Sequence, residues 1–300
     1  MSERGRSATS WRGLFHLGVV YLVWSSTYLA IRVAVRPGAG FAPYSLAALR
    51  CLMAFPLLLL WGRLRGLRLL PTRRELPILA ASGILLWTFG NALVVVAEQR
   101  VDSALAAILI ASTPIWVALL ESLADWRIPS RLKVAALLVG FAGTGLVGYP
   151  ALRSGVRADA LAVMALLVAA LSWGGGSLLQ RRHPVELDAL ASAAYQMLFG
   201  GLATTVMAIV FREPWPKPSA TAWMGFAFLL VFGSLISFTS FLKALHLLPT
   251  RVVFTYAYVN PVLATFLGWL ILGERVPSVA VAGGGLVLLG VAGAFRARDD

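Results

Sequence analysis

The sequence predicts an all-α integral membrane protein whose ten transmembrane helices form two inverted five-helix repeats. Apolar stretches of about twenty residues, the length needed to cross a bilayer, recur from Leu14 to Phe295. The second five stretches resemble the first five at an offset of 147 to 149 residues. Because each copy holds an odd number of spans, the two copies insert in opposite directions, an arrangement that many secondary transporters use.

The composition excludes a sizeable soluble domain. Hydrophobic residues make up 59% of the 300 residues and charged residues 13%, with a mean hydropathy of +0.81. An ordinary soluble domain carries about a quarter charged residues. The first span is too long for the h-region of a cleavable signal peptide and leads directly into further spans. The single cysteine, Cys51, falls inside a predicted span and is expected to be a packing residue.

The internal repeat rests on residues that recur in the same order in both halves. The correspondences are Trp24 with Trp173, Ala97 with Ala244, Pro114 with Pro261, Pro129-Ser130 with Pro277-Ser278, and Gly145 with Gly293.

The spans follow one another as apolar runs between short segments rich in arginine and lysine. After a tail at 1–13, the first repeat covers 14–149, with spans at 14–35, 42–62, 75–97, 103–121 and 131–149. A connecting loop at 150–158 leads to the second repeat, 159–295, and a tail at 296–300. The spans of the second repeat are placed at 159–178, 189–211, 221–243, 250–271 and 277–295.

The distribution of positive charge predicts the orientation. The net charge is +13, but the cations lie between spans, which indicates membrane topology and not a nucleic-acid surface. With the N-terminus inside, seventeen Lys and Arg residues fall in or beside inside segments and eight in or beside outside segments. This positive-inside bias predicts that both termini are cytoplasmic. The expected location is a bacterial inner membrane, which the chain would cross several times.

Matching prolines point to the region of a binding site. Pro114 and Pro261 fall near the middle of the fourth and ninth spans, and each frees a carbonyl one turn earlier, at Ile110 and Ala257. Paired helix kinks at midplane are typical of substrate sites in transporters, although simple packing kinks give the same pattern.

The repeat then selects polar and aromatic residues on neighbouring helices as candidate substrate contacts. They share helical faces by spacing, carry no charge, and would suit a small amphiphilic solute such as a zwitterionic amino acid. For any one of them, packing between helices is an equally good explanation. The set is Trp24, Tyr28, Trp87, Asn91, Thr113, Trp173, Ser177, Ser237, Phe238, Phe241, Tyr256 and Asn260.

Two charges inside the membrane need an explanation. Arg50 lies about eight residues into its span, where an unpaired charge is costly. Glu98, at the outer end of span three, is its best partner by depth, and Arg32 competes for it. We expect Arg50 and Glu98 to form a structural or gating pair. Spans one and six contain no acidic residue, which disfavours proton-driven export of cationic drugs.

Spans five and ten are rich in glycine and are expected to be packing elements outside the transport path. Small residues let helix backbones approach closely. Packing within a monomer is preferred over a dimer, which stays possible. Bulky substitutions at Gly143 or Gly284 are expected to damage folding.

Several motifs together resemble the EamA-type members of the drug/metabolite transporter superfamily. They are Tyr21 to Arg32, Leu49-Arg50, Gly90-Asn91, Ala97-Glu98-Gln99, Thr113-Pro114, Asn260-Pro261 and Gly273-Glu274-Arg275. The resemblance implies ten helices, a central cavity, and export or exchange of small metabolites such as amino acids. The sequence departs from the family at Ser25, where glycine is more common, and at Asp125-Trp126-Arg127, which replaces the Gly-Glu-Arg turn in the first copy.

The predicted function is therefore alternating-access transport of small uncharged or zwitterionic metabolites, with amino acids as the leading class. The alternatives are an exporter of lipophilic drugs and, more remotely, a membrane-embedded enzyme. The three histidines lie in different segments without metal-ligand spacing, and no nucleophile–base pair is recognisable. We expect no metal, no cofactor and no nucleic-acid partner. The expected partners are a small-molecule substrate and membrane lipid.

Overall fold

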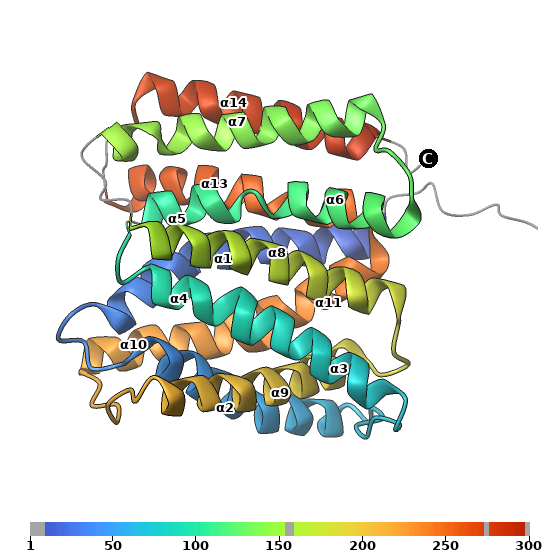
Figure 1. Ribbon diagram of the computed structural model, residues 1–300, viewed down its shortest axis with the longest axis vertical. Helices are drawn as coiled ribbons and strands as arrows, with labels where there is room; N and C mark the ends of the chain where they lie inside the picture. Colours follow the sequence, from blue (N-terminus) through green and yellow to red (C-terminus); the bar gives the residue numbers. More distant parts are fainter. Residues whose placement is uncertain (1–9, 102, 154–158, 273–275, 298–300) are drawn as a thin grey trace, which may run out of the picture.

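The structure is a computed structural model that describes residues 10–101, 103–153, 159–272 and 276–297 (Figure 1). Every regular element within these ranges is a helix, which confirms the predicted all-α fold. In the first copy the elements are α1 (Trp11–Val35), α2 (Pro43–Leu64), α3 (Glu75–Gly83), η1 (Ile84–Ala92), α4 (Leu93–Ala97), α5 (Ser103–Ile110), α6 (Thr113–Asp125) and α7 (Arg131–Arg153). In the second copy they are α8 (Ala160–Arg182), α9 (Ala189–Val210), α10 (Ala220–Phe228), η2 (Leu229–Phe238), α11 (Thr239–Leu247), α12 (Thr250–Val253), α13 (Tyr256–Leu272) and α14 (Ser278–Arg296).

Nine helical stretches within the described residues are long and apolar enough to cross a membrane. They correspond to nine of the ten predicted spans. The remaining span, predicted at 250–271, is helical but interrupted, because α12 ends at Val253 and α13 begins at Tyr256. As a result α13 has 17 residues, fewer than the usual length of about 20 for a transmembrane helix.

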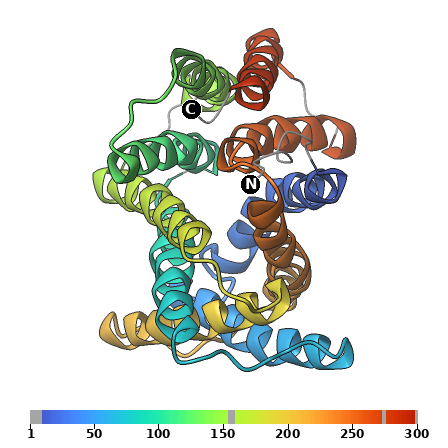
Figure 2. The same cartoon turned by 90° about the vertical axis from the view of Figure 1, so that its right-hand side faces the viewer.

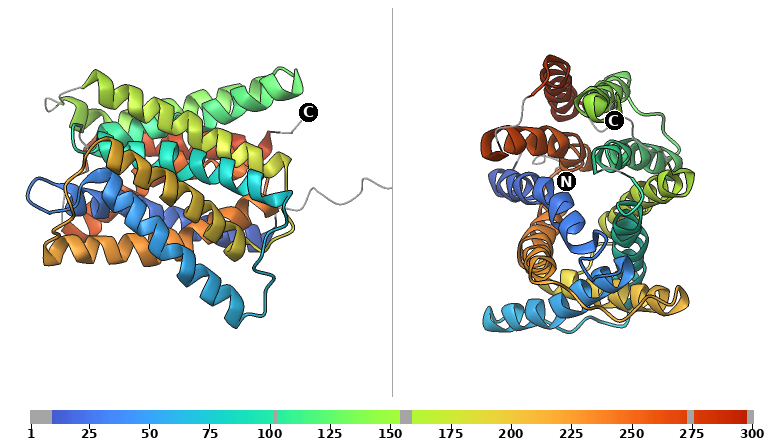
Figure 3. Two further views of the ribbon diagram at one scale, coloured as in Figure 1. Left: turned by 60° about the horizontal axis from the view of Figure 1, so that its bottom comes forward. Right: turned by 90° about the vertical axis from the view of Figure 1, so that its left-hand side faces the viewer.

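The helices form two walls that are closed off by two helix pairs (Figure 2). The pair α7–α14 lies at one edge of the bundle and the pair α2–α9 at the other, as Figure 3 also shows. Between them, the first wall consists of α1, α10–η2–α11 and α12–α13. The second wall consists of α8, α3–η1–α4 and α5–α6.

Each wall combines helices from both sequence repeats. The first helix of the chain, α1, packs on α10, η2, α11 and α13 of the second copy, and α8 packs on α3, η1, α4 and α6 of the first copy. The two copies have thus exchanged their first helices. The units that pack together are therefore these mixed walls, and not residues 14–149 and residues 159–295 taken separately.

Both described chain ends lie at the same end of the bundle, which we call the terminal end. The guanidinium Nε of Arg251, just after α11, donates to the carbonyl of Ala294 near the end of α14 at 3.1 Å. The start of α1 is beside the same region, because a Cβ added at Gly13 would lie 2.6 Å from Leu248 Cγ. The loops that join α1 to α2 and α9 to α10 lie at the opposite end.

Backbone and carboxylate bonds tie the copies together at the opposite end. The amide of Lys217 donates to the carbonyl of Gly40 at 3.0 Å. The Glu213 carboxylate accepts from the amides of Tyr44 at 2.9 Å and Ser45 at 2.7 Å, so it satisfies free N–H groups at the start of α2. At the same end, the amides of Ala162 and Leu161 and the Arg100 guanidinium hold the pKa of the Asp159 carboxyl below its ordinary value.

The outer surface of the bundle is apolar, as a lipid-facing surface requires. Leu288 and Leu289 on α14 are 65% and 64% exposed, and Leu138 on α7 is 58% exposed. On the inner side of the same pair, the α7 and α14 backbones touch at their glycines. The glycine-rich spans therefore pack on each other within one chain.

Candidate functional site

Two π-helical segments lie in the middle of the third and eighth spans, one in each copy. They are η1 and η2, which carry Trp87 and Asn91, and Ser234, Ser237 and Phe238, respectively. π-helical turns are rare and are frequent at functional sites, because the wider turn alters where side chains point. Sequence reasoning missed both segments, since the apolar pattern of these spans is equally compatible with an α-helix.

Six of the predicted substrate residues meet in one aromatic cluster between the walls. From the first wall come Trp24, Phe238, Phe241 and Tyr256, and from the second come Trp87 and Trp173. Trp24 links the walls: its ring centroid is 5.4 Å from that of Trp173 and 4.9 Å from that of Tyr256. Both contacts are edge-to-face, the arrangement that aromatic quadrupoles favour.

The cluster is deepest at its phenylalanines. Phe238 and Phe241 are 0% exposed and Trp87 is 1% exposed. Trp24 and Trp173 are half-buried. Asn91, one turn beyond Trp87, is also half-buried. Trp24, Trp173 and Asn91 are therefore less buried than Phe238, Phe241 and Trp87.

Arg50 of α2 lies against this cluster and is 4% exposed. Its Nε donates to the Ser234 hydroxyl at 2.6 Å, and its Nη1 donates to Asn91 Oδ1 at 3.4 Å. The guanidinium carbon is 4.9 Å from the centre of the Trp87 ring, a cation–π contact. Arg50 therefore contacts two of the predicted substrate residues, Trp87 and Asn91, although it was not among them.

The expected pair between Arg50 and Glu98 is not formed in this structure. Glu98 is 8% exposed, and neither of its carboxylate oxygens has a hydrogen-bond partner. Arg32 of α1 is close enough to act on this carboxylate electrostatically. Tyr28, another predicted substrate residue, lies within electrostatic range of both Glu98 and Tyr256 and packs beside Val94 and Ala97. Depth along the span was thus a poor guide, because Arg50 turns toward η1 and η2 and Glu98 turns toward α1.

The other predicted polar residues fall into two groups. The hydroxyls of Thr113 and Ser177 donate to carbonyls of their own helices, at Ile110 (2.6 Å) and Trp173 (2.7 Å), so their hydrogens are already used. Ser237 Oγ and Asn260 Oδ1 are buried without a hydrogen-bond partner in the described chain. Buried polar atoms are nearly always satisfied by protein, water or ligand. These two atoms are therefore better candidates than Thr113 or Ser177 for a polar contact to a bound solute.

The two prolines do not interrupt their helices in the same way. Pro114 opens α6 directly after the break at Ala111–Ser112. Pro261 lies inside α13, and the break in that span comes earlier, at Phe254–Thr255. Irregular backbone is present in both copies, but it does not fall at equivalent residues.

Hydrogen bonds join the two walls at the terminal end, away from the aromatic cluster. Arg181 Nη1 of α8 donates to the carbonyls of Leu245 (2.8 Å) and Leu248 (2.7 Å) beside α11. Glu121 of α6 accepts from the Thr250 hydroxyl of α12 and from Lys133 Nζ at 2.9 Å. A cavity of about 350 Å³ lies among these residues.

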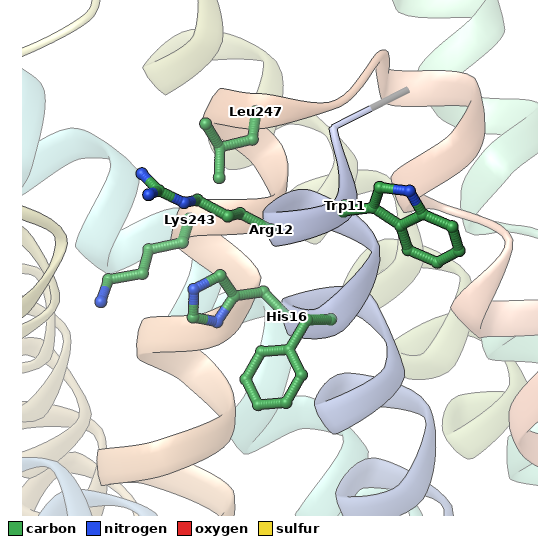
Figure 4. A pocket seen from close by; sticks show the side chains of 6 residues that line it. Trp11, Arg12, His16, Lys243 and Leu247 are labelled. Atoms are coloured by element: carbon green, nitrogen blue, oxygen red, sulfur yellow. The ribbon is translucent and has the colours of Figure 1, made fainter. Parts of the chain in front are cut away.

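A second pocket, of about 480 Å³, opens between the start of α1 and the end of α11 (Figure 4). Its lining includes Trp11, Arg12, His16 and Lys243, and none of the predicted substrate residues lines it. Trp11 and Phe15 are 84% and 69% exposed, as expected for aromatic residues at a membrane interface.

Comparison with known proteins supplies the family. Residues 11–149 and 160–296 each match the EamA-like transporter family. The chain is 30% identical over 279 residues to a protein called "Uncharacterized inner membrane transporter YedA" in Escherichia coli K12, covering 92% of this chain and 88% of that one. It is 23% identical to "Uncharacterized transporter YdfC" of Bacillus subtilis, covering 89% and 85%.

A protein crystal structure has the same fold, with a TM-score of 0.78 at 21% identity, and the match covers 96% of this chain and 99% of that one. The match of both repeats and the similarity to these relatives show that this multi-pass membrane protein is a transporter and belongs to the EamA-like transporter family.

Proposed function

We propose that this transporter carries small zwitterionic or uncharged metabolites, with amino acids as the leading class, by alternating access through a site between the two walls. The observation that carries the proposal is the aromatic cluster, to which both walls contribute rings around half-buried Trp24, Trp173 and Asn91. Rings pack on the apolar part of a solute, and the amide and the unpaired Asn260 and Ser237 oxygens hold its polar part.

Alternating access needs contacts between the walls that exchange as the site opens to each side. The bonds from Arg181 to Leu245 and Leu248, and from Thr250 to Glu121, supply such contacts at the terminal end. They would have to break when the site opens there. At the opposite end, Tyr28 on α1 packs against α4, so that contact would take the complementary role.

An exporter of lipophilic cations is the alternative. It is less well supported, because the charge nearest the cluster is the cation Arg50, and α1 carries no carboxylate. Uptake of a labelled amino-acid panel and of a lipophilic cation into proteoliposomes, with and without a pH gradient, separates the two. Saturable amino-acid uptake with trans-stimulation by unlabelled solute supports the proposal, and uptake of the cation alone contradicts it.

We expect Trp173→Ala to lower substrate uptake by about tenfold or more, because this ring contacts residues of both walls and anchoring aromatic side chains dominate binding energy. Asn91→Ala and Tyr256→Phe are expected to have smaller effects in the same direction. Initial uptake rates in proteoliposomes, normalised to folded protein, provide the measurement.

The matched control is Trp223→Ala on α10, a tryptophan that is 45% exposed and packs on Phe41 and Phe226, away from the cluster. Its uptake should stay near that of the unchanged protein. Equal uptake by Trp173→Ala and Trp223→Ala would place the site elsewhere.

We further propose that the terminal end faces the cytoplasm, as the charge bias predicts. Leu70→Cys and Trp215→Cys place an exposed thiol at the terminal and opposite ends, since these side chains are 76% and 87% exposed. The native Cys51 is 1% exposed and gives little background. An impermeant maleimide added to intact cells should label only Trp215→Cys. Labelling of Leu70→Cys from outside would reverse the orientation.

A further inference from the structure

Resting on the proposed function, we infer that Arg50 is the receptor for a carboxylate group of the transported solute. Its guanidinium would hold the carboxylate at the edge of the aromatic cluster, and the remainder of the solute would pack among the rings. This adds a charged anchor to a site that the sequence predicted to be uncharged.

The first argument is that Arg50 is a buried cation without an anion. It is 4% exposed, and its polar and ring contacts within the described residues are all neutral: the Ser234 hydroxyl, the Asn91 amide oxygen and the Trp87 ring. Glu98, the acid expected to pair with it, makes no hydrogen bond. Buried charges in membrane proteins are costly unless paired, and those that persist mark functional sites.

The second argument is that the guanidinium is held in place with donors left over. A guanidinium has five N–H donors. Two of its hydrogen bonds are made, through Nε and Nη1, and Nη2 has no hydrogen-bond partner in the described chain. The Ser234 hydroxyl donates to the Leu229 carbonyl at 3.1 Å, so its oxygen is turned to accept from Arg50. Such a fixed fork binds a carboxylate well, because little side-chain freedom is lost on binding.

The third argument is the position of Nη2 beside Gly233 and Trp24. A Cβ added at Gly233 would lie 3.0 Å from Nη2 and 3.4 Å from Thr27 Cγ2, so the glycine keeps a side chain out of this position. Trp24 lies at the same place, because its Nε1 is 3.5 Å from the Gly233 carbonyl. The free face of the guanidinium therefore adjoins the half-buried ring that joins the two walls.

The residues that cradle Arg50 come from both copies. Trp87 and Asn91 lie on η1 in the second wall, and Gly233 and Ser234 lie on η2 in the first. A carboxylate bound here would contact a cation whose partners move apart when the walls move. Binding and wall movement would thereby be coupled.

The test compares carboxylates with their neutral carboxamides. Purified protein is heated with a panel of amino acids and of aliphatic and aromatic monocarboxylates, each beside its amide, in chloride-free buffer, and the unfolding temperature is recorded. We expect at least one carboxylate to stabilise the protein and its amide not to. Arg50→Gln should weaken that carboxylate by about 30-fold or more, as loss of one member of a buried charge pair does. The control is Arg63→Gln, an exposed arginine on the same helix, which should keep the carboxylate preference.

Arg50→Lys is the second variant, in case Arg50→Gln does not fold, because it keeps the positive charge and loses only the forked geometry of the guanidinium. It should bind the carboxylate more weakly than the unchanged protein but still in preference to the amide. The inference is overturned if no carboxylate outperforms its amide, if Arg50→Gln keeps the preference, or if chloride alone reproduces the shift. Proteoliposome uptake separates the proposed carrier function from the proposed role of Arg50. Saturable uptake restricted to amines or neutral solutes contradicts the role of Arg50 and is consistent with the carrier function. Carboxylate binding without any saturable uptake contradicts the carrier and leaves Arg50 as a receptor.

Discussion

Gly283→Leu is expected to destabilise the protein by more than about 3 kcal/mol, because it forces apart two helix backbones that now touch. A Cβ at Gly283 would lie 2.7 Å from the carbonyl oxygen of Gly143 and 2.7 Å from the amide nitrogen of Val147. Both are backbone atoms, which cannot rotate away as a side chain does. Gly143→Leu should act similarly, since its Cβ would lie 2.6 Å from the Val287 amide.

The control is on the same helix. Nothing lies within 4 Å of a Cβ at Gly285, and at Gly284 the nearest atom is Val262 Cγ1 at 3.6 Å, so leucine at Gly285 should be tolerated. The sequence analysis expected bulky substitutions at Gly284 to damage folding, but the glycine that packs against α7 is Gly283. The buried native Cys51 reports unfolding through the temperature at which a thiol-reactive dye labels it. Equal midpoints for Gly283→Leu and Gly285→Leu would contradict the packing argument.

Glu75→Ala is expected to lower stability by about 3 kcal/mol, because it removes a buried carboxylate that joins the two copies. The Glu75 side chain is 9% exposed. It accepts from the Thr72 amide at 2.7 Å, the Thr72 hydroxyl at 2.9 Å, the Glu186 amide at 2.9 Å and the Arg68 guanidinium. Glu186 lies between α8 and α9, so the carboxylate anchors the loop before the seventh span.

Glu186→Ala is the matched control, because the Glu186 side chain is 90% exposed. Among the described residues its carboxylate makes only an ion pair with Arg68, with 3.7 Å between Glu186 Oε2 and Arg68 Nη1. Exposed ion pairs contribute at most about 1 kcal/mol. The same dye-labelling midpoint should fall markedly for Glu75→Ala and hardly at all for Glu186→Ala. A similar loss in both would mean that the carboxylate of Glu75 is not the link between the loops.

Much of the aromatic cluster that forms the candidate site could be predicted from the sequence, because the repeat constrains it. Trp24, Trp87, Trp173, Phe238, Phe241 and Tyr256 were selected by helical spacing and internal correspondence, and the structure places all six together. Spacing along a helix specifies a face. It does not specify which neighbouring helix that face meets, and this is why Thr113 and Ser177 were included although their hydroxyls bond within their own helices.

The sequence by itself determined the all-helical membrane fold, the odd-span duplication and the aromatic character of the site. These depend on local hydrophobicity and residue spacing, which every position carries independently of its distant neighbours. Only the tertiary structure decided that α1 and α8 exchange between copies, that η1 and η2 widen into π-helices, and that Arg50 meets Ser234 and Asn91 and not Glu98. Each of these depends on which way a side chain turns around its helix axis when helices distant in sequence pack together, and the linear order of residues does not contain that rotation.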